Sequence, residues 1–241
     1  MSHGLWHCHA YWTSPLTIID ETAVGLTSRG RAVHARIVTA AGDMIYHQGL
    51  SNTTVNSVRA AAAVSGSQMT HYFEDKRALV RSVVAQRRDE VVSFHTEGRL
   101  VRLDSFQALQ DWADLNVQKQ IDEDFVGGCA FGSLVGELLT SDQDIRNDLS
   151  AVYDEWIALF RNALTAMRAR GELRPDADPR HLARILVAAH QGGHMLTQTT
   201  RSAKPLRDAL NAAVQYVCSF ASEPVTLIKR RRSRQRSSLA K

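Results

Sequence analysis

The chain has 241 residues and a formal net charge of +4, and 44% of its residues are hydrophobic against 22% that are charged. This composition describes a globular chain of one large domain or two small ones, and it excludes a disordered protein or one with a membrane span of roughly 18 apolar residues. The first residues lack the basic and apolar blocks of a secretory signal, and three scattered cysteines favour a reducing cytoplasm over a disulfide framework.

Residues 1–28 show no sustained hydrophobic period and carry a net charge of −2, so we expect a flexible N-terminal arm. A group of four metal-binding residue types lies within it: His3, His7, Cys8 and His9. Two readings stay open for this group. Either it binds a soft metal ion, or it belongs to a segment without fixed structure.

The first expected helix starts at Arg29 and ends before Gly49, a residue type common after helix C-termini. An apolar stripe at helical spacing is expected to face a core: Val33, Ile37, Ala40, Ala41, Met44 and Ile45. Residues 29–88 carry a net charge of +6, and residues 89–224 carry −7. A basic segment beside an acidic one is typical of a nucleic-acid-binding module joined to another domain, although charge also varies along chains by chance.

Next come two short helices joined by a turn at residues 64–66. Thr53 is the expected N-cap of the first of them, where its hydroxyl and the free N–H groups would suit a phosphate. The second runs from Ser67 to Phe73, and Asp75 can cap a fourth, longer helix. Apolar residues of all three are expected to point inward: Val55, Val58, Ala62, Met69, Phe73, Leu79, Val80, Val83 and Val84.

The outward face of residues 66–73, GSQMTHYF, is polar and contains no acid. Two short helices with such a face on the second describe a helix-turn-helix, in which the second helix lies in the major groove of DNA. Gln68 can pair with an adenine edge, while Ser, Thr and Lys side chains suit phosphates or bases. The alternative is a solvated turn that lacks acids by accident.

The remaining chain also shows helical periods, at residues 103–121, 129–140, 142–170, 179–198 and 204–220. Alternating β-branched runs are absent, so the expected fold class is all-α. Residues 224–241 form a basic tail, with a net charge of +7 from residue 225 onward. This tail either adds non-specific DNA affinity or is a solvated, disordered end.

The run from Arg29 to Leu79 resembles the TetR family of bacterial transcriptional regulators. The resemblance depends on a Gly after the first helix, a Thr at the second helix start, the pattern V-x-x-V-x-x-x-A, then V-S-x-x-x-[apolar]-x-H-Y-F and D-K-x-A-L. It implies a DNA-binding head at 29–76, an effector-binding and dimerisation body at 77–223, and a homodimer. It also implies the DNA contacts, which fall on Thr53, Thr54, Ser65, Ser67, Gln68, Thr70, His71, Tyr72 and Lys76.

Two features depart from the family pattern. Thr70 stands where many members have Tyr before the His, so an aromatic phosphate contact is lost. Residues 60–63 are four alanines where many members have a charged residue in the second helix. The Thr70 change affects the expected operator contact rather than the fold.

The segment GGCAFGSLVGEL resembles the start of the sixth helix in one subgroup of the family, and the resemblance implies a pocket among helices five to seven. The expected liners are Trp112, Asn116, Phe125, Phe131, Leu134, Trp156 and Phe160, although for any single one of them plain core packing is the preferred reading. Many aromatics with few charges favour a hydrophobic effector. The resemblance also places the dimer interface on the last two helices, at His190, Gly193, His194, Leu210, Val214 and Val217.

Catalytic and metal sites are not expected. His190 and His194 lie one turn apart and could bind a metal, but no third ligand has matching spacing, and packing at the dimer contact is the preferred reading. The glycines of residues 127–132 lack the GK[ST] ending of a phosphate-binding loop. No nucleophile, base and orienting group are found together, so no cofactor and no enzymatic activity are expected.

The sequence therefore predicts a DNA-binding transcriptional regulator, a repressor released from a double-stranded operator by a hydrophobic small molecule, acting as a homodimer in the cytoplasm and not at a membrane. Two other hypotheses stay open. One is a helical small-molecule-binding protein or enzyme whose basic head is incidental, and the other is a nucleoid-type protein that binds DNA through its tail alone.

Overall fold

The computed structural model describes residues 20–97, 100, 102–140 and 142–227. The regular elements within these ranges are helices, as expected, and their only β feature is an isolated bridge between Leu173 and Ala221. The basic tail beyond residue 227 and the histidines of the arm lie outside the described residues. Both readings of each therefore stay open.

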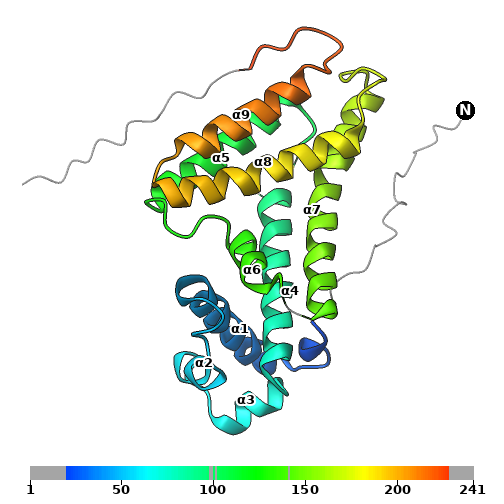
Figure 1. Ribbon diagram of the computed structural model, residues 1–241. Helices are drawn as coiled ribbons and strands as arrows, with labels where there is room; N and C mark the ends of the chain where they lie inside the picture. Colours follow the sequence, from blue (N-terminus) through cyan, green and yellow to red (C-terminus); the bar gives the residue numbers. More distant parts are fainter. Residues whose placement is uncertain (1–19, 98–99, 101, 141, 228–241) are drawn as a thin grey trace, which may run out of the picture. The chain divides into compact units, whose positions relative to one another are not determined.

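The helices follow in the order η1 (Glu21–Ala23), α1 (Ser28–Gln48), α2 (Val55–Ala61), α3 (Gly66–Tyr72), α4 (Lys76–Thr96), α5 (Phe106–Asp122), α6 (Ala130–Leu138), α7 (Gln143–Ala169), α8 (Pro179–Thr200) and α9 (Lys204–Cys218) (Figure 1). The described residues form two compact units. The first extends to Gln86 and includes Leu138–Glu155, and the second comprises Arg87–Glu137 and the residues from Trp156 onward. The division falls inside α4 and α7.

Helix α1 is bounded by local hydrogen bonds. Thr27 caps its start by accepting the N–H of Gly30 at 3.1 Å. At its end Gly49, with φ 83°, donates its N–H to the carbonyl of Ile45 at 2.9 Å. A glycine at this place follows from the positive φ, which side chains disfavour.

Helices α2 and α3 each start with a reciprocal capping box. Thr54 accepts the N–H of Ser57 and donates its own N–H to the Ser57 hydroxyl, at 3.1 and 3.0 Å. Ser65 and Gln68 repeat this pattern at α3, at 3.1 and 2.9 Å. Each box satisfies two backbone donors at a helix start, which explains why such short helices form.

The core of the first unit contains most of the residues that the hydrophobic period selects, while Val33, Ala40, Met44 and Val55 are only half-buried. Val58 of α2 and its C-cap Ala62, with Met69 of α3 and its C-cap Phe73, are at most 3% exposed. The four apolar residues expected inward on the fourth helix are buried too, at 0–4% exposure. Asp75 accepts the N–H of Ala78 at 2.7 Å, which confirms it as a cap for α4.

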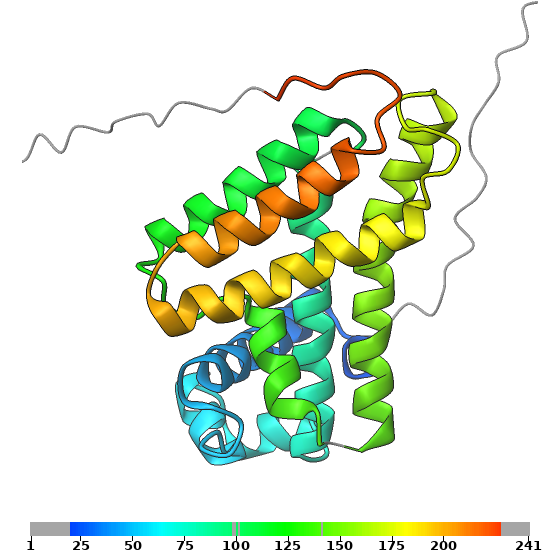
Figure 2. The same ribbon diagram turned by 45° about the horizontal axis from the view of Figure 1, so that its top comes forward.

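In the second unit α9 packs along α8 and α5, as both views show (Figures 1 and 2). Gly193 of α8 allows the close approach, because a Cβ there would lie 2.8 Å from Cδ1 of Leu206. Leu206, Leu210 and Val214 of α9 are fully buried in this contact. Among the described residues, no helix is both long enough and apolar enough to cross a bilayer.

Candidate DNA-reading surface and buried polar cluster

Helix α3 presents the face that its sequence predicts. Ser67, Gln68, Thr70 and His71 are exposed, while Met69 is 2% exposed. An exposed row of hydroxyl, amide and imidazole groups without a carboxylate offers hydrogen-bond donors and does not repel phosphate. This arrangement matches the second helix of a helix-turn-helix.

Gln68 has two separate roles on this face. Its side-chain oxygen accepts the N–H of Ser65 in the capping box. Within the residues that the structure describes, no hydrogen bond occupies its amide nitrogen. The oxygen thus fixes the side chain, and the NH₂ group keeps two donors for a base edge or a phosphate.

Thr53 requires a correction. It was expected at the N-cap of the second helix, but the cap is Thr54. Thr53 is 2% exposed, and its hydroxyl donates to the carbonyl of Gly49 at 2.9 Å. Of two consecutive threonines only one can occupy the cap, and the neighbouring Thr54 is the exposed one.

Three further residues expected to contact DNA have internal partners. Lys76 donates to the carbonyl of Leu50 at 2.8 Å, so one of its three N–H donors holds the loop after α1. The Thr70 hydroxyl donates back to the carbonyls of Gly66 and Ser67, both at 3.2 Å. Tyr72 is half-buried, and its ring meets that of His71 edge-on at 4.9 Å.

His34 of α1 was not singled out from the sequence, yet it connects the arm to α3. Its Nε2 lies 2.7 Å from the hydroxyl of Thr22 and 3.6 Å from a carboxylate oxygen of Asp20. Its ring lies 5.0 Å from that of Phe73 and 6.0 Å from that of Tyr72. The sequence does contain a signal that His34 is buried, because His34, Val38 and Ala41 follow one another at helical spacing on one face of α1.

Burial lowers the pKa of His34, and the charge of Asp20 opposes this shift. Asp20 also accepts the hydroxyl proton of Ser82 at 2.9 Å and the N–H of Thr22 at 3.1 Å. The end of the arm is therefore tied by side chains to α1 and α4. We call Asp20, Thr22, His34 and Ser82 the arm clasp.

In the second unit, six of the seven expected pocket liners are buried, at 0–3% exposure: Trp112, Asn116, Phe131, Leu134, Trp156 and Phe160. Phe125 is different. It lies half-exposed in the loop after α5 with φ 59°, and its carbonyl accepts a hydrogen bond from Arg201. Trp112 and Phe160 meet edge-on with ring centroids 4.8 Å apart.

His95 of α4 stands at the centre of this aromatic group. Its Nδ1 lies 2.7 Å from the carbonyl of Val91, and its Nε2 accepts the indole N–H groups of Trp112 and Trp156 at 3.1 and 3.0 Å. Nδ1 therefore carries the proton, because Nε2 faces two donors. Burial lowers the pKa of His95 to about 4.

A second polar group adjoins these aromatics. Nε2 of His190 lies 2.9 Å from Oδ1 of Asn116 and 3.0 Å from Nε2 of His194. His190 also stacks on Trp112, with ring centroids 5.8 Å apart. Burial lowers the pKa of both histidines, that of His194 to about 4. Both imidazoles are therefore neutral at pH 7.

A metal site at these histidines lacks ligands. In the part of the chain that the structure describes, no group of three or more His, Cys, Asp or Glu side chains could hold an ion. The partners of His190 are an amide and a second imidazole. The pair thus belongs to a polar network inside the unit.

The six residues expected at a dimer interface also require a correction. His190, Gly193, His194, Leu210, Val214 and Val217 are buried within the single chain, the two histidines at 4% and 5% exposure and the leucine and valines at 0%. They pack α8 against α5 and α9, so their side chains offer no surface to a second copy. The resemblance to a family can indicate which helices form an interface. Packing within the chain decides which face of each helix remains exposed.

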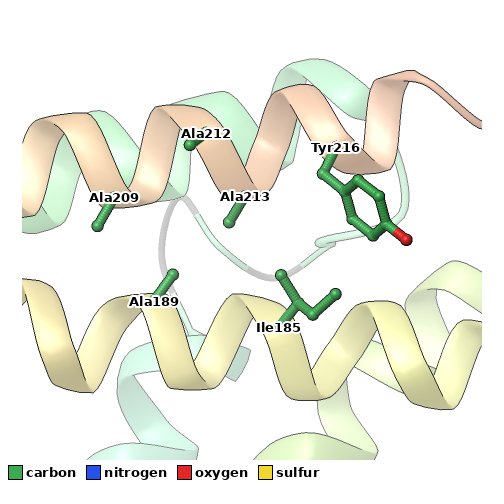
Figure 3. A pocket seen from close by; sticks show the side chains of 6 residues that line it. All are labelled: Ile185, Ala189, Ala209, Ala212, Ala213 and Tyr216. Carbon is green, nitrogen blue, oxygen red and sulfur yellow. The ribbon is translucent and has the colours of Figure 1, made fainter.

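The free faces of α8 and α9 carry a shallow groove of about 310 Å³ between them (Figure 3). It is lined by Ile185, Ala189, Ala209, Ala212, Ala213 and Tyr216. Met195 and Leu196 on the same helix α8 are 70% and 55% exposed, and Tyr216 is 40% exposed. Exposed apolar side chains on the same helices as a groove of small residues are typical of a surface that contacts another protein.

Comparison with known proteins agrees with both parts of this description. Residues 37–83 match the family model described as bacterial regulatory proteins, tetR family. Residues 106–213 match the model described as Tetracyclin repressor-like, C-terminal domain. The chain therefore belongs to the tetR family, and it is a DNA-binding transcriptional regulator.

Individual relatives are distant. The chain is 23% identical to the HTH-type transcriptional repressor DhaR of Mycobacterium sp. over 76% of this chain and 91% of that one. It is 26% identical to an uncharacterized HTH-type transcriptional regulator of Lactococcus lactis over 71% of this chain and 86% of that one.

Solved structures share the fold. A TetR transcriptional regulator from Chloroflexus aurantiacus superposes with a TM-score of 0.68 at 23% identity, covering 81% of this chain and 98% of that one. The regulatory protein TetR from Rhodobacter sphaeroides gives 0.65 at 19% identity, covering 76% and 98%.

Proposed function

We propose that this regulator is a homodimeric repressor that reads an operator with α3 and is released from it by a small molecule bound in the second unit. The observation that supports this most is the acid-free, exposed face of α3 above buried Met69 and Phe73. In this proposal the DNA-binding domain spans residues 29–76 and the effector-binding and dimerisation domain spans 77–223.

The proposed DNA contacts divide by chemistry. Gln68 and His71 read base edges, because each offers an exposed nitrogen donor on α3. Thr54, Ser65, Ser67, Thr70, Tyr72 and Lys76 bind phosphates, since hydroxyl and ammonium groups fix the register of a protein on the duplex without reading it. Thr53 is left out because its hydroxyl is bonded inside the head.

The proposed dimer forms through the α8–α9 groove. A two-fold interface needs one patch that fits itself, and the alanines of the groove let two such helix pairs approach closely. Met195, Leu196 and Tyr216 would be covered by the second copy. Two heads held in this way read half-sites about one helical turn apart, roughly 34–36 Å, or at another spacing set by the dimer.

Release follows from coupling between the two sites. A ligand that favours a head separation poorly matched to DNA lowers operator affinity, and the operator lowers ligand affinity by the same factor. The second unit supports a binding role because its core contains an aromatic and imidazole cluster rather than plain aliphatic packing.

Footprinting on DNA upstream of the chain's own gene tests this proposal. The expected result is a protected, two-fold related site that persists in excess random DNA at moderate salt. Deleting residues 225–241 should preserve this protection, because the tail would add only non-specific affinity. Protection that disappears with the tail, or equal binding to all sequences, would show that α3 does not read the operator.

A further inference from the structure

Three buried polar atoms of the second unit have no hydrogen-bond partner: Oε1 of Gln120, Nδ1 of His190 and Nδ1 of His194. Asn116 and Gln120 lie one turn apart on α5, and His190 and His194 lie one turn apart on α8. We call these four residues the α5–α8 seam. Because an unpaired buried polar atom is costly, three in one seam indicate a group that pairs with them.

The tautomers of the seam follow from its hydrogen bonds. The amide NH₂ of Asn116 donates to the carbonyl of Trp112 at 2.8 Å, so its Oδ1 is free to accept. His190 therefore carries its proton on Nε2 and donates it toward Asn116. Its unpartnered Nδ1 is then a lone-pair acceptor.

His194 must be the opposite tautomer. Its Nε2 lies 3.0 Å from the protonated Nε2 of His190, and two N–H groups would repel each other at this distance. His194 Nε2 is therefore an acceptor, and the proton of this neutral ring is on Nδ1. The seam thus offers two free acceptors, on Gln120 and His190, and one free donor, on His194.

The surroundings of the seam are aromatic. Trp112 stacks on His190 with an angle of 23° between the rings, and Trp156 meets His190 edge-on at 4.9 Å. The indole N–H groups of both tryptophans are already bonded to His95. The rings around the seam are therefore apolar and leave no indole N–H free to donate.

Charge and hydrogen-bond pairing together favour a neutral ligand. Lys119 lies close enough to both seam histidines for its charge to lower their pKa values, and the same charge disfavours a cation. A carboxylate would face two acceptors for one donor. A hydroxyl group both donates and accepts a hydrogen bond. It can therefore pair with one free acceptor of the seam and with the free donor of His194 at the same time.

We propose that the α5–α8 seam binds a neutral aromatic compound with a hydroxyl group, whose oxygen accepts from His194 and whose proton goes to His190 or Gln120. This inference rests on the proposed effector-binding role of the second unit and names the ligand class for it. The seam residues are at most 5% exposed, so the ligand enters by separating side chains of α5 and α8. That separation is the event that would couple binding to the rest of the protein.

Calorimetric titration of the purified full chain tests the proposal with matched probes. 4-Ethylphenol and 2-naphthol each have a hydroxyl, and ethylbenzene and naphthalene are their counterparts without it. We expect the hydroxylated member of each pair to bind at least about tenfold more tightly, which corresponds to one extra hydrogen bond with a buried group. Benzoate and benzylammonium should bind more weakly than either phenol.

Variants on α5 show whether the seam is responsible. Gln120→Leu removes one free acceptor and should reduce the preference for hydroxylated probes at least threefold without unfolding the protein. Gln118→Leu makes the same change on an exposed turn of the same helix and should leave the preference unchanged. His194→Phe removes the free donor and should reduce it further.

Equal affinity for both members of a pair, or equal effects of the two glutamine variants, would overturn the proposal. Absence of binding by both phenols would overturn it too. The proposed function has a separate readout, since footprinting is done without ligand. If the phenols bind at the seam but leave operator affinity unchanged, the ligand class holds and the proposed release mechanism fails.

Discussion

His34 is a single side chain through which the N-terminal arm contacts the end of α3. Its ring packs on Phe73 and Tyr72, and Thr22 and Asp20 hold its Nε2. We predict that His34→Ala lowers the unfolding free energy by about 1–3 kcal/mol, the usual range for losing a buried polar partner. Operator affinity should fall as well, because α3 loses support.

His47→Ala is the matched control for this prediction, since His47 lies exposed on the same helix. Denaturant unfolding and gel shifts on both variants separate the outcomes. If the two variants have equal stability and equal operator affinity, the arm clasp has no role in holding α3.

The buried histidines predict an acid sensitivity of the second unit. The pKa of His95 is lowered to about 4 by burial, below the ordinary value of 6.5. The unfolded chain then binds the proton more readily, so stability is complete above pH 6.5 and falls as the pH drops toward 4. The expected slope is about 1.4 kcal/mol per pH unit for each such histidine.

Denaturant unfolding between pH 7 and pH 4.5 measures this slope. His95→Gln should make it shallower, whereas His181→Gln changes an exposed imidazole and should not. A wild-type stability that rises on acidification over this range would contradict the assignment of neutral buried imidazoles.

The ammonium group of Lys76 donates one hydrogen bond to the carbonyl of Leu50, and its other donors are proposed to bind a DNA phosphate. Lys76→Ala should weaken binding to operator and random DNA alike. The salt dependence of binding should become shallower by about 0.9 in log–log slope, the value for one neutralised phosphate. Gel shifts at several salt concentrations measure this, and Lys204→Ala, which changes an exposed lysine of α9, should leave the slope unchanged. A loss confined to the operator would instead assign Lys76 to base reading.

At the scale of elements, helix positions follow closely from the sequence, because apolar residues at helical spacing and capping residues are both local signals. The expected first helix starts one residue late, at Arg29 instead of Ser28. The turn before α3 is less well predicted. It was expected at residues 64–66, where Gly66 lies, but the left-handed residue is Ala63, with φ 51°.

Ala63 offers a stability prediction for this turn. An alanine in the left-handed region destabilises the folded state by about 1–2 kcal/mol, and a glycine there avoids this cost. The glycine lowers stability by about 0.4–1 kcal/mol in turn, because it gives the unfolded chain more conformational freedom. Ala63→Gly should therefore raise the unfolding free energy by up to about 1 kcal/mol, as measured by denaturant unfolding. The variant for comparison is Gly66→Ala, because Gly66 lies inside α3 and an added Cβ there would meet no neighbouring atom. A less stable Ala63→Gly variant would mean that the turn is not strained.

At the scale of the whole molecule, the sequence predicts the fold class and family but not the free faces of the helices. His190 and His194 were expected at a dimer contact and instead join Asn116 in the core. Neighbouring positions on a helix differ by about 100°, so a family pattern that places a helix at an interface does not decide which of its sides faces outward. Distant partners, such as His95 with Trp156, likewise depend on packing that local patterns do not contain.

The proposed dimer surface can be tested by a substitution in the α8–α9 groove. Ala212→Arg places a charge in the α8–α9 groove and should weaken the dimer roughly 100-fold, the equivalent of about 3 kcal/mol for burying an unpaired charge. Sedimentation at several protein concentrations measures the change. Ala35→Arg, at an exposed alanine of α1, is the matched substitution and should leave the dimer unchanged. A variant with Ala212→Arg that stays dimeric would move the interface elsewhere.

The most direct measurement of the central claim, that α3 reads DNA sequence, is selection of binding sites from a random duplex pool by the full chain and by Gln68→Ala. We predict that the wild type enriches a motif of two related half-sites, and that Gln68→Ala relaxes the preference at one base position in each half-site while the rest of the motif persists. A pool without an enriched motif, or a motif that Gln68→Ala leaves unchanged at every position, would contradict the claim.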